Sequence, residues 1–211
     1  MKGLLAKDFA LFVQRKRTFI FLAVWAVVIA FSMDGSFMTG WMTIISSFFA
    51  ISSLTYDEYD NCYPFLMSMP VTGKIYAIEK YLFGFLCGFG AWIFSVAVYL
   101  VVAAIKGQLA TPGTEIIKLA VFIPVFMLLI DISLPLNLKF GSEKGRIAIL
   151  LIWGVVFVGI FVLTKLFDVT IRIDETIFSE LAIIGTVFLA AAVLTVISIL
   201  LSIRIMQNKE F

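Results

Sequence analysis

The sequence predicts an all-α protein that crosses a membrane six times, and three observations predict this fold class. Hydrophobic residues make up 62% of the 211-residue chain and charged residues only 14%, whereas soluble domains carry about 25% charged residues. The mean hydropathy is +1.10. Apolar segments recur six times along the chain, each near the roughly 20 residues that an α-helix needs to cross a bilayer. A soluble globular domain is therefore excluded.

The charged residues delimit the predicted spans. We place all six within a single transmembrane domain that comprises residues 1–211. The first span is short for a hydrocarbon core of about 30 Å, so we expect its flanking side chains to reach toward the interface. The predicted spans are residues 18–34, 35–56, 81–105, 119–138, 147–164 and 181–203.

Basic residues are distributed unevenly between the two sides of such a bundle. Six spans place both termini on one side, and all but four of the 16 lysine and arginine residues fall on that side. Lysine and arginine are enriched in cytoplasmic loops. The sequence therefore predicts a multi-pass membrane protein with both termini in the cytoplasm. The exceptions are Lys106, Lys118, Lys165 and Arg172.

The first element is predicted to be an amphipathic helix over residues 3–14. Leu5, Phe9 and Phe12 follow a spacing of i, i+4 and i+7, while Lys7 and Gln14 should face away from them. Such a helix lies in the cytoplasmic interface, just before a cluster of three basic residues. Two interpretations stay open: a membrane anchor that sets the topology, or a mechanical element that moves with a cytoplasmic partner.

The connection after the second span is predicted to be an acidic cytoplasmic loop. Asp57, Glu58 and Asp60 place three carboxylates within four positions. They can dock a basic patch on a soluble partner, or they can form a loop that is merely solvated. Pro64 and Pro70 bracket a short apolar segment that follows.

Two features inside the predicted spans could carry function. Asp131 is a carboxylate inside the fourth span, where it must face protein or water. A hydrogen-bonded packing role is favoured over a proton relay or a contact with a cationic substrate. Gly84 and Gly88 form a small-residue face on the third span, which predicts close helix packing within the subunit or across a dimer.

Several classes of protein are excluded by what the sequence lacks. The chain has no histidine, so it cannot form a histidine-based catalytic or metal site. It contains no phosphate-binding loop of the Walker type, and we therefore expect no ATPase or other enzyme in this chain. A net charge of +2 supplies no broad basic face for nucleic acid. The two cysteines, Cys62 and Cys87, are predicted to be free thiols.

Three stretches carry a resemblance to a known family. They are the N-terminal MKGLLAKDF, the segment YDE with the following YPFLMSMPVTGKIYAIEKYL, and LPLNLKFGSEKGRI over residues 134–147. In this order they resemble the ABC-2 type permeases of Gram-positive bacteria. Within that family the chain is most similar to the small six-span permeases of the phenol-soluble modulin exporter kind.

The resemblance implies a half-transporter of the bacterial plasma membrane that forms a homodimer and works with two copies of a cytoplasmic ATPase. ATP and Mg²⁺ would be bound by the ATPase, and no cofactor by this chain. The loop after the second span would form a coupling helix, a second contact would follow the fourth span, and the N-terminal helix would be the interfacial connecting helix. The implied coupling residues are Tyr56, Asp57, Glu58, Tyr59 and Asp60, then Pro70 and Lys74, and then Lys139, Gly141, Glu143, Lys144 and Arg146.

The resemblance also implies a transport activity. We expect the export of amphipathic or hydrophobic peptides by alternating access, in toxin or antimicrobial-peptide export or in immunity. The alternative is the substrate-binding membrane subunit of an energy-coupling-factor vitamin importer, which would bind one vitamin tightly by itself. An intramembrane enzyme that uses Asp131 is a further, less favoured alternative, because this aspartate has no evident partner.

Overall fold

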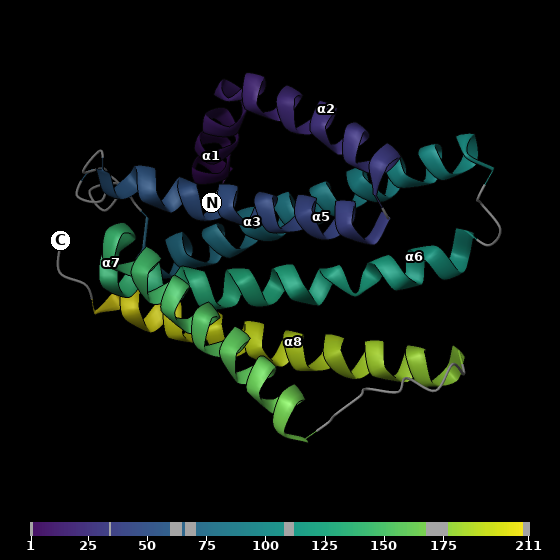
Figure 1. Cartoon of the computed structure of the whole chain (residues 1–211). Coiled ribbons are helices and arrows are strands. Elements are labelled where there is room, and N and C mark those ends of the chain that lie inside the picture. The colour runs from purple at the N-terminus through teal and green to yellow at the C-terminus, as the bar shows by residue number, and fades with distance from the viewer. Residues whose placement is uncertain are drawn as a thin grey trace.

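A computed structural model of the chain describes residues 2–33, 35–59, 65, 71–107, 112–167 and 177–208. Every regular element that we name among these residues is an α-helix (Figure 1). The fold is therefore all-helical over the described part of the chain, as predicted. The helices are α1 (Lys2–Gln14), α2 (Lys16–Ser32), α3 (Gly35–Tyr59), α5 (Gly73–Ile105), α6 (Pro112–Ala120), α7 (Phe122–Phe167) and α8 (Ile177–Gln207).

Four of the helical segments are long and apolar enough to cross a membrane. They are Gly35–Glu58, Gly73–Ile105, Ile116–Ile152 and Ile184–Gln207. Helix α2 has 17 residues, so it is short for a span, as its sequence indicates. The predicted number of six spans stays a prediction, although each predicted span falls largely within a helix.

The core lies where α3, α5, α7 and α8 pack against one another, and these helices run side by side in Figure 1. Helix α5 is central because it contacts α3, α7 and α8. Large side chains fill the space between these helices, whereas the outward faces of α2, α5 and α8 are mostly apolar and exposed. The buried cluster includes Leu54, Tyr76, Tyr81, Phe126, Ile130, Leu134, Leu138 and Met206.

A sharp turn divides α7 into two helical halves. Gly141 has φ of +80° and ψ of 171°, a conformation that side chains with a Cβ rarely adopt. Figure 1 shows α7 reversing its direction near its label. The turn therefore brings the second half of α7 back from one end of the bundle.

That end of the bundle gathers elements from distant parts of the sequence. It contains the last turn of α3, the first turn of α5, the Gly141 turn and the last turn of α8, with α1 alongside. Gly73 at the start of α5 is close to the backbone of Met206 in α8. We call this the terminal end, and the opposite end, which holds the α2–α3 corner, the distal end.

Candidate functional site

Four charged side chains meet inside the terminal end. Lys7 and Asp8 come from α1, Asp57 comes from α3 and Lys80 comes from α5. The Lys80 Nζ atom lies 2.5 Å from Asp8 Oδ2 and 2.9 Å from Asp57 Oδ2. Lys7 forms an ion pair with Asp57 and lies 3.3 Å from Asp8 Oδ1. Because opposite charges alternate in this group, each buried charge has a partner that offsets its loss of hydration.

Neutral side chains complete this buried ion cluster. Lys80 also donates to the Ser53 hydroxyl at 3.1 Å, and the Tyr76 hydroxyl donates to Asp57 at 2.9 Å. Glu79 is fully buried beside the cluster, with its nearest carboxylate oxygen 4.0 Å from Lys80. Groups of three or more residues that could hold a metal ion are absent from the described part of the chain. The cluster therefore ties α1 to α3 and α5 through its own lysines.

The position of Lys7 corrects one prediction. Lys7 does not face away from the protein; it reaches the carboxylate of Asp57. The buried side of α1 is centred on Leu4 and Asp8, whereas Phe9 is 41% exposed. Burial disfavours the charged ammonium, but the hydrogen bond that Lys7 donates to Asp57 and the negative charges of Asp57 and Asp8 outweigh this effect and raise the pKa of Lys7 above its ordinary value.

The other predicted residues of the N-terminal helix still contact the bundle. Leu5 and Phe12 pack against the buried pair Phe83 and Cys87 of α5. Phe9 meets the edge of the Phe83 ring, with the two ring centroids 5.4 Å apart. The apolar residues of α1 therefore pack on protein. Hydrophobic spacing could not locate the buried side of this helix correctly, because one of its buried residues is the charged Asp8.

The position of Asp57 corrects a second prediction. Helix α3 continues to Tyr59, so Asp57 lies in a helix and is 2% exposed. Its carboxylate is occupied by Lys7, Lys80 and Tyr76. Asp57 therefore offers no exposed acidic charge to a partner. The predicted residues Asp60 and Pro70 lie outside the described residues.

Glu58 joins the two segments that the family resemblance identified. Its Oε2 atom accepts a hydrogen bond from the backbone N–H of Ser142 at 2.5 Å. Ser142 begins the second half of α7, and a helix N-terminus favours a carboxylate at this position. A Cβ at Gly141 would collide with the same carboxylate. The end of α3 and the turn of α7 are thus one connected structure.

The exposed charges that are described at the terminal end are mainly basic. Tyr56 lies beneath the Arg15 guanidinium, 4.7 Å from the ring centroid to Arg15 Cζ. The acidic Glu143 is exposed among several basic side chains. The described surface at this end is therefore mainly basic, whereas the sequence predicted an acidic loop, part of which lies outside the described residues. Besides Arg15, its exposed basic residues include Lys74, Lys139, Lys144, Arg146 and Arg204.

Asp131 belongs to a second polar network, deeper in the bundle. Thr195 of α8 donates to Asp131 Oδ2 at 2.6 Å, and Ser198 donates to the Asp131 carbonyl oxygen at 2.5 Å. Tyr81 of α5 is hydrogen-bonded to Ser198 at 2.5 Å and to Ser202 at 2.9 Å. This geometry is that of a hydrogen-bonded packing contact that links α5, α7 and α8.

Sequence reasoning missed the partners of Asp131, although a signal for them exists. Thr195, Ser198 and Ser202 follow a spacing of i, i+3 and i+7, which places them on one face of an apolar helix. Three small hydroxyl residues on one face of a membrane helix indicate interhelical hydrogen bonds. Their spacing could not indicate which helix supplies the carboxylate.

The small-residue face of α5 packs within the chain. Gly84 and Gly88 are both buried. The ring of Phe126 in α7 occupies the space that a Cβ at Gly88 would need. Gly88 thus permits the close approach of α5 and α7 in this subunit.

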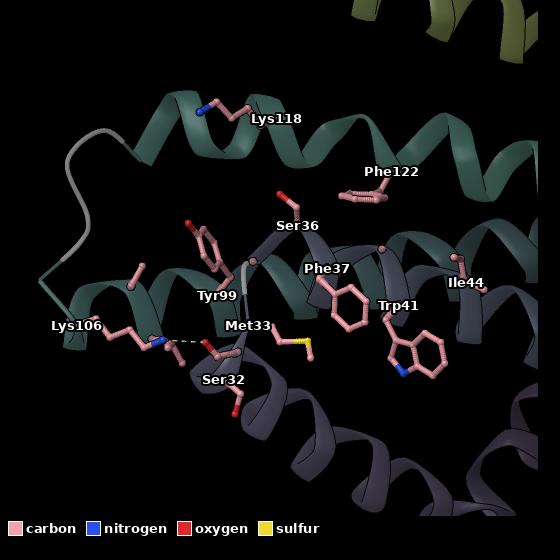
Figure 2. A pocket seen from close by; sticks show the side chains of 15 residues that line it. Ser32, Met33, Ser36, Phe37, Trp41, Ile44, Tyr99, Lys106, Lys118 and Phe122 are labelled. Carbon is pink, nitrogen blue, oxygen red and sulfur yellow. Dashed lines mark hydrogen bonds between the residues drawn. The ribbon is translucent and has the colours of Figure 1, made fainter. Parts of the chain in front are cut away.

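A cavity of about 1,090 Å³ opens at the distal end, and sequence reasoning did not predict it. Figure 2 shows it between the α2–α3 corner, the end of α5 and the start of the α6–α7 segment. Trp41, Tyr99 and Phe122 contribute aromatic rings to its lining. Lys106 closes one side, where its Nζ atom donates to the carbonyl oxygen of Phe31 at 2.9 Å and thereby caps the end of α2.

Comparison with known proteins gives one finding for the whole chain. A family model described as "ABC-2 family transporter protein" matches residues 3–207. No curated protein and no solved structure matches the chain.

Proposed function

Since this chain belongs to the ABC-2 family of transporter proteins, we propose that it is the permease subunit of an ATP-driven exporter. The family and the apolar helices together indicate a multi-pass membrane protein, and such permeases normally work with an ABC ATPase. The alternative of a vitamin-binding subunit is not retained, because the family match covers nearly the whole chain. The observation that carries the proposal is the family match over residues 3–207, and the Glu58–Ser142 contact indicates where the chain could couple to the ATPase.

In this proposal the terminal end faces the cytoplasm and receives the ATPase. The end of α3, with Tyr56, Glu58 and Tyr59, and the turn of α7 are joined by the Glu58 carboxylate. A displacement imposed by the ATPase at either segment would therefore move both. The exposed basic residues of that turn, Lys144 and Arg146 above all, suit an acidic groove on the partner.

The buried ion cluster extends this connection to the N-terminal helix. Since Lys7 and Asp8 bond to side chains of α3 and α5, movement of α3 carries α1 with it. This supports the mechanical interpretation of α1 over that of a passive anchor. Two permease copies and two ATPase copies would then alternate between inward and outward access as ATP, bound with Mg²⁺ by the ATPase, is hydrolysed.

We assign amphipathic or hydrophobic peptides as the substrate class, in toxin or antimicrobial-peptide export or in immunity. The resemblance to permeases of the phenol-soluble modulin exporter kind supports this assignment. The 22 phenylalanines of the chain are consistent with an apolar translocation path. Stimulation of ATP hydrolysis by amphipathic peptides, measured on the reconstituted transporter, tests it; stimulation by small drugs alone would overturn it.

The docking proposal is tested by isolating the chain from its native membrane in a mild detergent. We expect a Walker-type ATPase to co-purify in equal ratio. The triple variant Lys139→Gln, Lys144→Gln, Arg146→Gln should lose it, whereas Lys118→Gln, an exposed lysine at the distal end, should keep it. Retention of the ATPase by the triple variant would refute docking at this surface.

A further inference from the structure

An apolar pocket lies on the side of the bundle, apart from the Glu58 contact and the distal cavity. Its volume is about 410 Å³, within the range of roughly 300–1,000 Å³ typical of ligand sites. Residues of α1, α2, α3 and α5 line it, among them Phe12, Phe19, Phe49, Cys87 and Gly90. In Figure 1, α2 diverges from the bundle toward its N-terminus, where α1 joins it.

The lining of this pocket suits a hydrocarbon chain. Phe12 and Phe19 have ring centroids 3.8 Å apart, and Phe19 and Phe49 are 5.0 Å apart, so three rings form one continuous wall. The Ser46 hydroxyl, the polar exception in the described lining, donates to the Thr43 carbonyl oxygen at 2.8 Å. The pocket therefore presents almost no unsatisfied polar group to an occupant.

The outer surface of α2 shows from which direction an occupant would come. Ile20 and Val24, neighbours of the lining residues Phe19 and Ala23, are 63% and 59% exposed. These apolar side chains face outward from the bundle, toward the membrane hydrocarbon. An occupant from the leaflet at the terminal end would therefore approach the pocket laterally, past α2.

Three basic residues lie along the chain between the lining residues Phe12 and Phe19, and we call them the basic border of the pocket. The exposed residues Arg15, Lys16 and Arg17 connect α1 to α2. Lys16 precedes Phe19 by three residues and Ala23 by seven, so it shares the face of α2 that lines the pocket. Arg17 lies on the opposite side of α2 from the lining residues Phe19 and Ala23. Arg15 lies beyond the aromatic wall, over Tyr56.

We propose that this pocket binds an anionic phospholipid, with one acyl chain against the phenylalanine wall and the phosphate at Lys16 and Arg15. The combination of a lateral apolar pocket and a basic border matches the two ends of such a lipid. A lipid in the pocket would stabilise the orientation of α1 relative to the bundle. It would thereby hold Lys7 and Asp8, which lie on α1, in the ion cluster. The proposal requires a membrane around the chain, and it does not depend on the ATPase or on the transported substrate.

The experiment uses the full chain in lipid nanodiscs. Phosphatidylglycerol and phosphatidylcholine, each with the same diazirine-bearing acyl chain, are photo-crosslinked, and the adducts are located by peptide mass spectrometry. We expect adducts on the pocket residues of α1, α2 and α5, several-fold more with phosphatidylglycerol. Lys16→Gln should reduce this labelling about fivefold, in line with roughly 1 kcal/mol for one basic residue at an anionic surface. Arg17→Gln, the matched control, should change it much less.

A second pair of variants separates the pocket from the general lipid surface. Gly90 lines the pocket, and a Cβ there meets no atom within 4 Å, so Gly90→Leu adds apolar bulk at the pocket from a backbone position that accepts a side chain. It should abolish pocket labelling by both lipids, whereas Gly185→Leu, equally free of contacts on α8, should not. Equal labelling by the two lipids, persistence of labelling in Gly90→Leu, or displacement of the lipid by equimolar amphipathic peptide would overturn the proposal.

Discussion

The Lys80 ammonium and the Asp8 carboxylate lie 2.5 Å apart and are both buried, although 72 positions separate them in the sequence. Their contact holds the N-terminal helix α1 against α5, which lies far along the sequence. It also explains how an aspartate and a lysine are retained inside a protein that is so poor in charge. Each charge makes the burial of the other tolerable.

Removal of one member of this pair should be strongly destabilising. Lys80→Met leaves Lys7 as the one lysine of the cluster that pairs with Asp8 and Asp57, and breaking a buried ion pair costs about 3–5 kcal/mol. We expect a large fall in the thermal unfolding midpoint of the detergent-solubilised protein. Lys74→Met, at an exposed position of the same helix, should leave the midpoint nearly unchanged. Similar midpoints for the two variants would contradict the ion cluster.

The ion pair of Lys7 predicts a dependence of stability on pH in the alkaline range. Because the pKa of Lys7 is raised in the folded protein above its usual 10.5, its contribution is complete below that value and is lost as the pH rises through the folded pKa. The difference in unfolding midpoint between the natural protein and Lys7→Gln should therefore be constant from neutral pH to about pH 10 and shrink above it. A difference that shrinks between pH 6 and 8 would be inconsistent with this origin.

The Gly141 turn allows backbone strain to be separated from side-chain collision. Gly141→Ala places a Cβ at a positive φ and against the Glu58 carboxylate, so it should destabilise the protein by at least about 1 kcal/mol. In a Glu58→Ala background the collision is removed and only the backbone strain remains. Gly141→Ala should therefore lower the stability of the Glu58→Ala protein by less than it lowers that of the natural protein. Gly154→Ala, where a Cβ meets nothing, is the control. If the double variant is as stable as Glu58→Ala alone, the backbone at Gly141 carries no strain.

Substitution of Asp131 should distinguish packing from proton transfer. Asp131→Asn preserves an oxygen that can accept from Thr195, so transport should continue. Asp131→Leu leaves the Thr195 hydroxyl with its bond to the Ala191 carbonyl oxygen at 3.0 Å, so the loss of the interhelical bond should cost about 1 kcal/mol of stability. Both variants are assayed for peptide transport in proteoliposomes and for thermal unfolding. Loss of transport in a stable Asp131→Asn protein would instead support a proton relay.

Some aspects of the protein could be predicted from its sequence. Composition and the lengths of the apolar segments predict helices, because a chain in hydrocarbon must satisfy its backbone hydrogen bonds internally. The described fold is all-helical with four membrane-capable helices, and the family expectation is confirmed at the level of ABC-2 transporters. The number of spans, the orientation and the substrate stay predictions.

The placement of the charges could be decided only by the tertiary structure. The sequence predicted that Lys7 faces away from the apolar side of its helix and that Asp57 lies in an acidic loop, because a local pattern contains no information about a charge on another helix. The structure brings Lys7, Asp8, Asp57 and Lys80 together from three helices, and it joins Glu58 to Ser142 across 84 positions. The sequence by itself determined which segments are helical and apolar, since these are local properties. Which charges are buried in pairs and which remain exposed is a property of contacts between helices, and only the folded chain decides it.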